Sequence, residues 1–111
     1  MTISTHVLDT SAGRPATGVA VRLEHHDGMR WLPVGDGVTN ADGRVPALVD
    51  AGVRLPSGKY RLVFEIGAYF GSRQLDTFYP RAVVEFLAPD AGHLHVPLLV
   101  SPYGYTTYRG S

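Results

Sequence analysis

Residues 93–111 have the sequence HLHVPLLVSPYGYTTYRGS. Leu94, Val96, Leu98 and Val100 recur at every second position in its first half. Side chains two positions apart lie on the same face of a β-strand, so this pattern predicts a strand with one continuous apolar face toward a core. The same alternation directs His93 and His95 away from that core. The segment therefore predicts a β-protein whose last long strand carries two outward histidines.

The end of the chain is rich in aromatic residues, with Tyr103, Tyr105 and Tyr108 before the final Arg-Gly-Ser. Large aromatic rings are normally packed, and a buried tyrosine hydroxyl normally has a hydrogen-bond partner. We therefore expect the tail to be held in place, unlike most chain termini. Pro97 removes a backbone donor, which favours an irregular strand or an edge strand here, and an edge strand suggests assembly with another subunit.

The rest of the chain repeats the pattern of short alternating segments between turns. Thirteen glycines and eight prolines punctuate it, and long helical periodicities are scarce, which is typical of a β-sandwich or barrel. Residues 59–66 alternate most clearly, residues 67–75 have room for one short helix, and Pro33 is expected to weaken or bulge its strand. The other expected strands are residues 3–9, 19–24, 29–38 and 81–88. We predict an all-β, two-sheet sandwich of seven to eight strands with one short helix, forming a single domain over 1–111.

Composition excludes several classes of function. The formal net charge is zero, whereas nucleic-acid binding requires a basic surface. No apolar segment approaches the roughly 20 residues of a membrane span, and no cysteine is present, which rules out disulfides and thiolate chemistry. No secretory signal is visible at the start, so we predict a cytoplasmic protein. A processed periplasmic form would look the same.

Three side chains and the chain terminus are the candidates for chemistry. His6 lies on the less apolar face of the first strand, Arg44 follows the tight Asp42-Gly43 turn, and His95 is on the last long strand. An imidazole with its ordinary pKa of about 6.5 can take a proton from water near neutral pH, and an arginine can hold a carbonyl or a developing oxyanion. Each residue alone is more often an ordinary surface group.

Other candidates have a weaker basis. His93 and His95 as a zinc pair need a third ligand, which the sequence does not offer, and His25-His26 is best interpreted as a solvated hairpin tip. The chain contains no nucleophile elbow, Walker loop, zincin motif or dinucleotide fingerprint.

Four segments together resemble the transthyretin-related family, and within it the 5-hydroxyisourate hydrolases. They are ISTHVLDTSAGRPA near the start, TNADGRV in the middle, the GKYRLVFEI segment with its following YF and FYP, and HVPLLVSPYGYTTYRGS at the end. The closing Tyr-Arg-Gly-Ser is the most specific motif, because the hormone-carrying transthyretins are expected to lack it. Leu94 departs from the family pattern, which often has tyrosine there, and we expect it to change packing rather than chemistry.

The resemblance implies a homotetramer with active sites at the interface between dimers, and it assigns roles to residues. It implies catalytic roles for His6, Arg44, His95 and Ser111, and substrate contacts from His6, Arg44 and Tyr108. It implies no metal and no organic cofactor. The implied reaction is the hydrolysis of 5-hydroxyisourate to 2-oxo-4-hydroxy-4-carboxy-5-ureidoimidazoline by attack of a histidine-activated water on the C6 carbonyl.

Two alternatives remain open at the level of sequence. The first is a transthyretin-like binding protein that holds a small aromatic ligand in its channel without turnover. The second is a structural sandwich domain, for which the Tyr-Arg-Gly-Ser end would have no use. Loss of ring opening in a folded His6 or Arg44 variant distinguishes an enzyme from both.

Overall fold

The computed structural model describes every residue from Met1 to Ser111. It contains eight strands and one helix. The elements are β1 (Thr2–Asp9), β2 (Arg14–Pro15), β3 (Ala20–His26), β4 (Trp31–Val38), β5 (Gly58–Phe64), α1 (Ile66–Gly71), β6 (Ala82–Ala88), β7 (His93–Ser101) and β8 (Gly104–Thr107). No helix has the length and apolar character needed to cross a membrane, and the cytoplasmic location stays a prediction.

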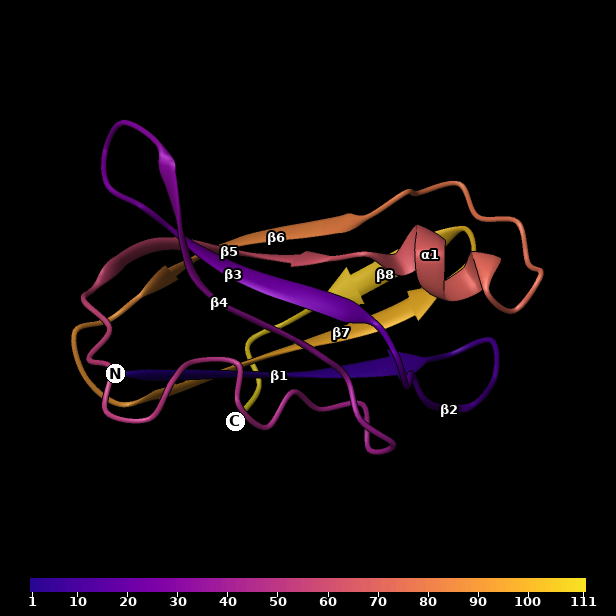
Figure 1. Cartoon of the computed structure of the whole chain (residues 1–111), viewed down its shortest axis with the longest axis horizontal. Coiled ribbons are helices and arrows are strands. Elements are labelled where there is room, and N and C mark those ends of the chain that lie inside the picture. Colours follow the sequence, from indigo (N-terminus) through magenta and orange to yellow (C-terminus); the bar gives the residue numbers. More distant parts are fainter.

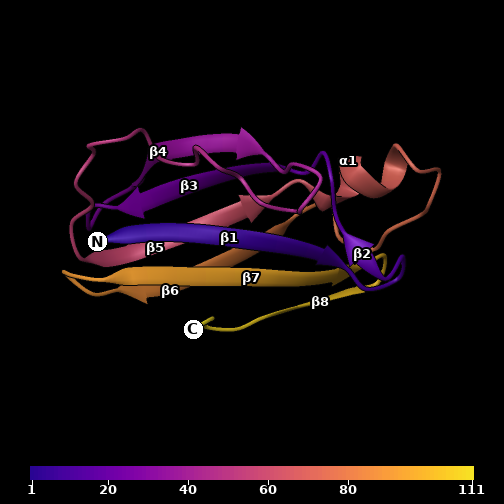
Figure 2. The same cartoon turned by 90° about the horizontal axis from the view of Figure 1, so that it is seen from below.

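The strands form two four-stranded sheets that face each other (Figures 1 and 2). One sheet has the order β2-β1-β7-β8 and the other the order β4-β3-β5-β6. All neighbouring strands are antiparallel except β1 and β7, which run parallel over their whole shared length. The predicted two-sheet, all-β sandwich with one short helix is thus confirmed.

The core fills the space between the sheets with the residues that the alternation predicted. Tyr60, Leu62 and Phe64 of β5 are fully buried, as are Val7 of β1 and Leu98 of β7. Removing such a side chain from water stabilises the fold by roughly 1.5–3 kcal/mol. The strands are therefore fixed in register by their apolar faces, and their opposite faces are free to carry other chemistry.

Helix α1 closes one end of the sandwich (Figure 1). It lies in the region for which the sequence predicted a helix, and it buries Ile66, Tyr69 and Phe70. The Tyr69 hydroxyl donates a 2.7 Å hydrogen bond to the carboxylate of Asp9 at the end of β1. Burial and this bond raise the pKa of Tyr69 to about 12, so the phenol remains a donor at all ordinary pH values. The helix is thus anchored to the sheet that carries β1.

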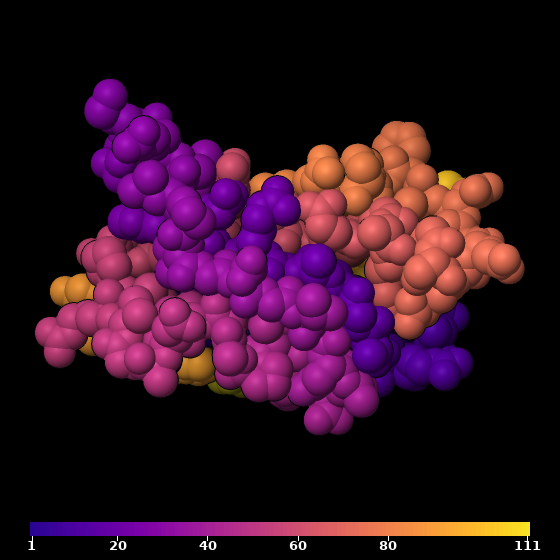
Figure 3. All heavy atoms as spheres, viewed as in Figure 1, coloured from indigo at the N-terminus to yellow at the C-terminus, as the bar shows by residue number.

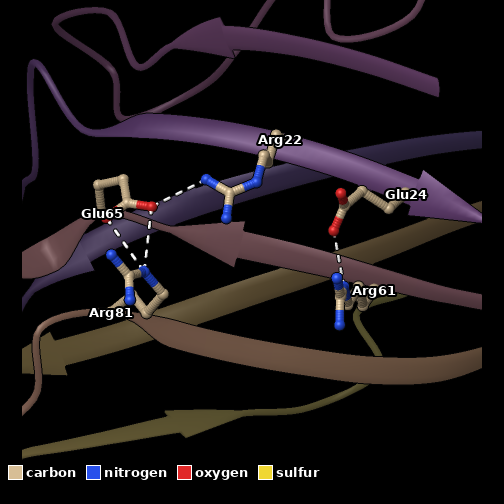
Figure 4. Close-up of polar contacts among 5 residues, drawn as sticks. All are labelled: Arg22, Glu24, Arg61, Glu65 and Arg81. Atoms are coloured by element: carbon tan, nitrogen blue, oxygen red, sulfur yellow. Dashed lines mark hydrogen bonds and ion pairs between the residues drawn. The ribbon is translucent and has the colours of Figure 1, made fainter. Parts of the chain in front are cut away.

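The outer face of the second sheet is covered by ion pairs. Figure 4 shows Arg22 and Arg81 converging on Glu65, and Arg61 on Glu24, at separations of 2.6–3.3 Å. Val63 lies in register between Arg22 and Val83 on this polar face, yet it is only 1% exposed. Three arginines and two glutamates of this face are therefore already held in ion pairs with one another.

Several local predictions differ from the structure. Strand β7 is neither irregular nor at an edge, because it lies between β1 and β8 with an unbroken register against β1. The backbone carbonyls of His95 and Pro97 accept from Gly110 and from the Thr107 hydroxyl. These groups of β7 therefore face the tail. The pairing of β7 with β8 ends at Leu98. Pro97 lies just beyond this pairing, so the backbone N–H that proline lacks would not have formed a bond to β8.

The tyrosines of the tail are also more exposed than predicted. Tyr103, Tyr105 and Tyr108 have exposed fractions of 70%, 37% and 55% in the single chain. Only Tyr105 has an aromatic neighbour, the ring of Tyr79 at 5.2 Å. The tail is held by its backbone rather than by its rings.

Two further details concern β3 and β4. The register shifts by one residue opposite Pro33, so the predicted bulge is confirmed. His25 and His26 belong to the end of β3 rather than to a solvated tip, because their rings pack against Tyr60 and Trp31 at 4.5 and 4.9 Å.

Candidate active site

The outward face of β1 and β7 brings the first two candidates together. The parallel register places Ser4 opposite His95 and His6 opposite Pro97. Because side chains alternate along both strands, all four point away from the core. The imidazole rings of His6 and His95 lie 6.4 Å apart and are tilted by 40°. The predicted meeting of the two histidines is therefore found within one chain.

Arg44 joins this face from the long connection between β4 and β5. That connection spreads over the viewed side of the molecule in Figure 3 (magenta). Asn40 closes the turn, since its backbone N–H donates to the Arg44 carbonyl at 2.8 Å and its side-chain oxygen accepts from the Arg44 N–H at 3.1 Å. Arg44 then forms an antiparallel bridge directly opposite His6, so the two side chains share a face.

The guanidinium of Arg44 is left without a carboxylate. The ion pairs of the chain involve Arg22, Arg61 and Arg81, and Arg44 is exposed. Arg44 therefore places a positive charge without an ion-pair partner beside two imidazoles. Such a place suits a planar ligand with carbonyl groups or negative charge.

His6 has one of its two ring nitrogens committed. Its Nε2 lies 2.7 Å from the backbone carbonyl oxygen of Asp42. A carbonyl can only accept, so Nε2 carries the hydrogen and Nδ1 is the basic atom of the neutral ring. Gly43 packs against the same ring. It has φ +77°, and a Cβ there would lie 3.2 Å from His6 Cδ2, so the turn provides both the bond and the space.

The end of the chain reaches His95 from the other side. The Gly110 N–H donates a 2.8 Å bond to the His95 carbonyl, and the two residues form an isolated antiparallel bridge. A Cβ at Gly110 would be 2.7 Å from His95 Cδ2, so only glycine allows this approach. Ser111 is the next residue and is exposed, and it makes no hydrogen bond or ion pair with His6, His95 or Arg44 within the single chain.

His95 is a base that stays neutral at physiological pH. Burial lowers its pKa below the ordinary value of 6.5, and the positive charges of Arg44, His6 and His93 lower it further. A neutral imidazole has a lone pair that can accept a proton from water. Perturbed ionisation next to an unpaired cation is typical of functional sites.

Tyr108, like Ser111, is a predicted site residue that the single chain does not join to this cluster. It borders a separate hollow of about 280 Å³ with Phe86 and Leu94, and it makes neither a hydrogen bond nor a ring contact with either histidine. No group of three or more His, Cys, Asp or Glu side chains is arranged to hold a metal ion.

Sequence reasoning overlooked three residues of the site. Ser4 contacts His95, Gly43 seats His6, and Gly110 seats His95. The parity of Ser4 with His6 was available from the sequence. Its contact with His95 was not, because it depends on the pairing of two strands about 90 positions apart in the chain.

A two-sheet sandwich with two histidines and an arginine on one outer face defines a transthyretin-like fold with a candidate hydrolytic site. The family model described as "HIUase/Transthyretin family" matches residues 3–110. The chain belongs to this family.

Individual relatives agree with this assignment. A protein of Salmonella dublin described as "5-hydroxyisourate hydrolase" is 47% identical over 110 residues, covering 98% of this chain and 80% of that protein. The solved 5-hydroxyisourate hydrolase of Klebsiella pneumoniae superposes with a TM-score of 0.84 at 42% identity, covering 98% of both chains. Sea bream transthyretin, solved in complex with thyroxine, superposes with a TM-score of 0.89 at 32% identity over 97% of this chain and 93% of that one. Backbone similarity thus does not separate the two branches, and the residues of the site must do so.

Proposed function

We propose that this protein hydrolyses 5-hydroxyisourate to 2-oxo-4-hydroxy-4-carboxy-5-ureidoimidazoline. One observation carries the proposal: β1 and β7 present His6 and His95 on one face, and isolated bridges to these two histidines bring Arg44 and Gly110 alongside them. The named hydrolase relatives at 42–47% identity support the same substrate. A thyroxine carrier has no need of a base and a cation on this face.

The proposed reaction uses a basic ring nitrogen of a histidine and the guanidinium of Arg44. A histidine, His95 or His6, accepts a proton from water, and the water oxygen attacks the C6 carbonyl of the substrate. Arg44 holds the substrate and stabilises the negative charge that develops on the carbonyl oxygen. The bond from C6 to the ring nitrogen breaks as the nitrogen takes the proton that the histidine accepted from water, and the carboxylic acid formed at C6 ionises to the carboxylate of the product. Geometry of this kind contributes about 10²–10⁴-fold for acid–base catalysis alone.

The chain end completes the site in this proposal. Ser111 follows Gly110, whose backbone is bonded to His95, so the terminus is positioned to orient the histidines. Tyr108 supplies substrate contacts. Because this tyrosine is exposed and apart from the cluster within one chain, we propose that it acts in a homotetramer, with the active sites between dimers. Light scattering coupled to size exclusion tests the assembly, and a monomer with full activity would contradict it.

The test of the reaction uses substrate made in place. Urate oxidase generates 5-hydroxyisourate, and its ultraviolet absorbance is followed with and without the protein. The proposal predicts decay faster than the spontaneous reaction, and loss of that acceleration in His6→Ala and Arg44→Ala variants that remain folded. A wild-type protein that binds the substrate and leaves its decay unchanged would instead indicate the carrier function.

A further inference from the structure

Four side chains form a continuous hydrogen-bonded chain along the outer face of β1 and β7. Thr2 Oγ1 lies 2.5 Å from His93 Nδ1, His93 Nε2 lies 3.0 Å from Ser4 Oγ, and Ser4 Oγ lies 2.7 Å from His95 Nδ1. The two strands place these residues as the directly opposed pairs Thr2–His93 and Ser4–His95. Both nitrogens of His93 and the inner nitrogen of His95 are thereby committed to hydroxyl groups.

This chain can run in either of two directions, because a hydroxyl both donates and accepts. In one direction His95 Nδ1–H donates to Ser4, Ser4 donates to His93 Nε2, and His93 Nδ1–H donates to Thr2. His95 Nε2 then has the lone pair. When every bond reverses, the hydrogen of His95 lies on Nε2 and that lone pair is lost. The direction of the chain therefore decides which nitrogen of His95 is basic.

His6 provides the contrast. Its Nε2 faces the carbonyl oxygen of Asp42, which accepts and never donates, so the hydrogen of the neutral ring is fixed. The partner of His95 Nδ1 is instead the Ser4 hydroxyl, 2.7 Å away, which can either donate or accept. A hydroxyl in that place leaves the proton of His95 free to move.

The geometry points to Ser4 and His93 as a proton relay that serves His95. This inference rests on the proposed hydrolase function. As His95 Nε2 accepts the proton of the attacking water, its Nδ1 proton passes to Ser4 Oγ and the hydroxyl proton of Ser4 passes to His93 Nε2. His93 becomes the imidazolium and then releases its Nδ1 proton to solvent. The nitrogen released from C6 then takes the Nε2 proton of His95, and the relay runs back as His93 Nδ1 regains a proton from solvent. The new carboxylic acid is ionised at neutral pH, so the site is restored and one proton leaves per turnover.

Exposure gives the relay an outlet. His95 is half-buried, whereas His93 is exposed and, with Ser4, borders a hollow of about 330 Å³ beside the first strand. His93 and Ser4 are thus positioning and relay residues, and neither needs to touch the substrate.

The first arm of the test observes the ring nitrogens of His95 directly. Nitrogen-15 spectra of histidine-labelled protein are recorded for wild type, Ser4→Ala, His93→Gln and Ser4→Thr. The relay predicts Nδ1 and Nε2 shifts averaged between protonated and unprotonated values in wild type and in Ser4→Thr, which keeps the hydroxyl. In Ser4→Ala one nitrogen becomes fully protonated. This arm needs no turnover, so it remains decisive even if the proposed reaction proves wrong.

The second arm measures turnover of 5-hydroxyisourate in light and heavy water. Ser4→Ala and His93→Gln should each lower kcat about 10- to 100-fold with KM within about twofold. In wild type, a plot of kcat against the deuterium fraction of the solvent should be curved, because several protons move in the same step. In both variants the plot should be linear. The double variant should lose no more than either single one, because the relay acts as a unit. Ser72→Ala is the matched control, because Ser72 is an exposed serine directly after α1, at the opposite end of the molecule from the N-terminus (Figure 1).

Both arms must respond for the relay to stand. If the nitrogen shifts of His95 are unchanged in Ser4→Ala, the hydroxyl does not set its proton. If the shifts change while kcat and the isotope dependence do not, Ser4 only orients the ring. Either result overturns the inference. A wild type without ring-opening activity instead overturns the proposed function.

Discussion

Replacing Gly110 with alanine tests whether the chain end acts through His95. The added Cβ would lie 2.7 Å from His95 Cδ2 and 3.3 Å from its Cβ, whereas carbon atoms in contact prefer about 3.5–4.0 Å. The tail or the imidazole must therefore move by about 1 Å. If the tail moves, the 2.8 Å bond from the Gly110 N–H to the His95 carbonyl is lost, which costs about 0.5–1.5 kcal/mol.

The consequences for stability and catalysis differ in size. A loss of about 1 kcal/mol lowers the melting temperature by a few degrees and leaves the protein folded. A displacement of about 1 Å in a catalytic group can reduce the rate about 100-fold. We therefore expect Gly110→Ala to melt almost like wild type and to lose about two orders of magnitude in kcat.

The control lies in the same tail. A Cβ at Gly104 would meet only the Ser101 hydroxyl, at 3.8 Å, so Gly104→Ala should keep both its melting temperature and its activity. The measurements are a thermal melt and the decay of 5-hydroxyisourate. The reasoning is refuted if Gly110→Ala turns over substrate as fast as Gly104→Ala, since His95 would then tolerate a displaced tail.

Three further predictions address other parts of the structure. Arg44→Gln should raise the pKa of His95, because the positive charge of Arg44 opposes its protonation, and a proton NMR titration of the His95 ring should show its midpoint at higher pH than in wild type. Tyr69→Phe removes a donor from the buried carboxylate of Asp9 and should lower the free energy of unfolding by about 1.5–3 kcal/mol in a urea titration near neutral pH; an unchanged midpoint would contradict this. An extension beyond Ser111 should reduce kcat while an equal extension at the other end does not, and equal activity of the two tagged proteins would exclude a role for the terminus.

The Asp9 prediction has a defined pH dependence. Burial works against ionisation of this carboxyl, but hydrogen bonds from Ser11, Tyr69 and the Ala12 amide outweigh it and lower the pKa below the ordinary 3.8. A lowered carboxyl pKa stabilises the folded state above the unfolded value, and the effect is lost as the pH falls through the folded value. Tyr69→Phe should therefore narrow the stability difference between neutral and strongly acidic solution, which urea titrations at several pH values measure.

Local periodicity predicted most of the strands and the direction of their side chains. The alternation around His95 correctly sent Leu94 and Val96 inward and the histidines outward, because parity depends only on the strand itself. The edge position inferred from Pro97 was wrong, because the effect of a missing backbone donor depends on the neighbouring strand and not on the strand itself. The pairing of β1 with β7 is likewise invisible to local patterns.

Only the histidines and the arginine of the site were predictable from the sequence. His6, Arg44 and His95 are residue types that commonly take part in catalysis, and the structure brings them together. Ser4 and Gly110 are ordinary residues whose importance comes from His95: the Ser4 hydroxyl lies 2.7 Å from its Nδ1, and a Cβ added at Gly110 would lie 2.7 Å from its Cδ2. Such partners follow from the sheet, not from the sequence.

The parallel pairing of β1 with β7 links the stability of the core to the geometry of the site. A slip of one residue would turn every side chain of one strand to the other face. Val7 of β1 and Leu98 of β7 are directly opposed and both fully buried, so the strand that slipped would expose its member of this pair at a cost of roughly 1.5–3 kcal/mol. The same register places Ser4 opposite His95. Burial of the apolar side chains of β1 and β7 therefore also fixes which polar side chains of the two strands lie opposite each other. Substitutions that shrink this part of the core should therefore disturb the two histidines before they unfold the protein.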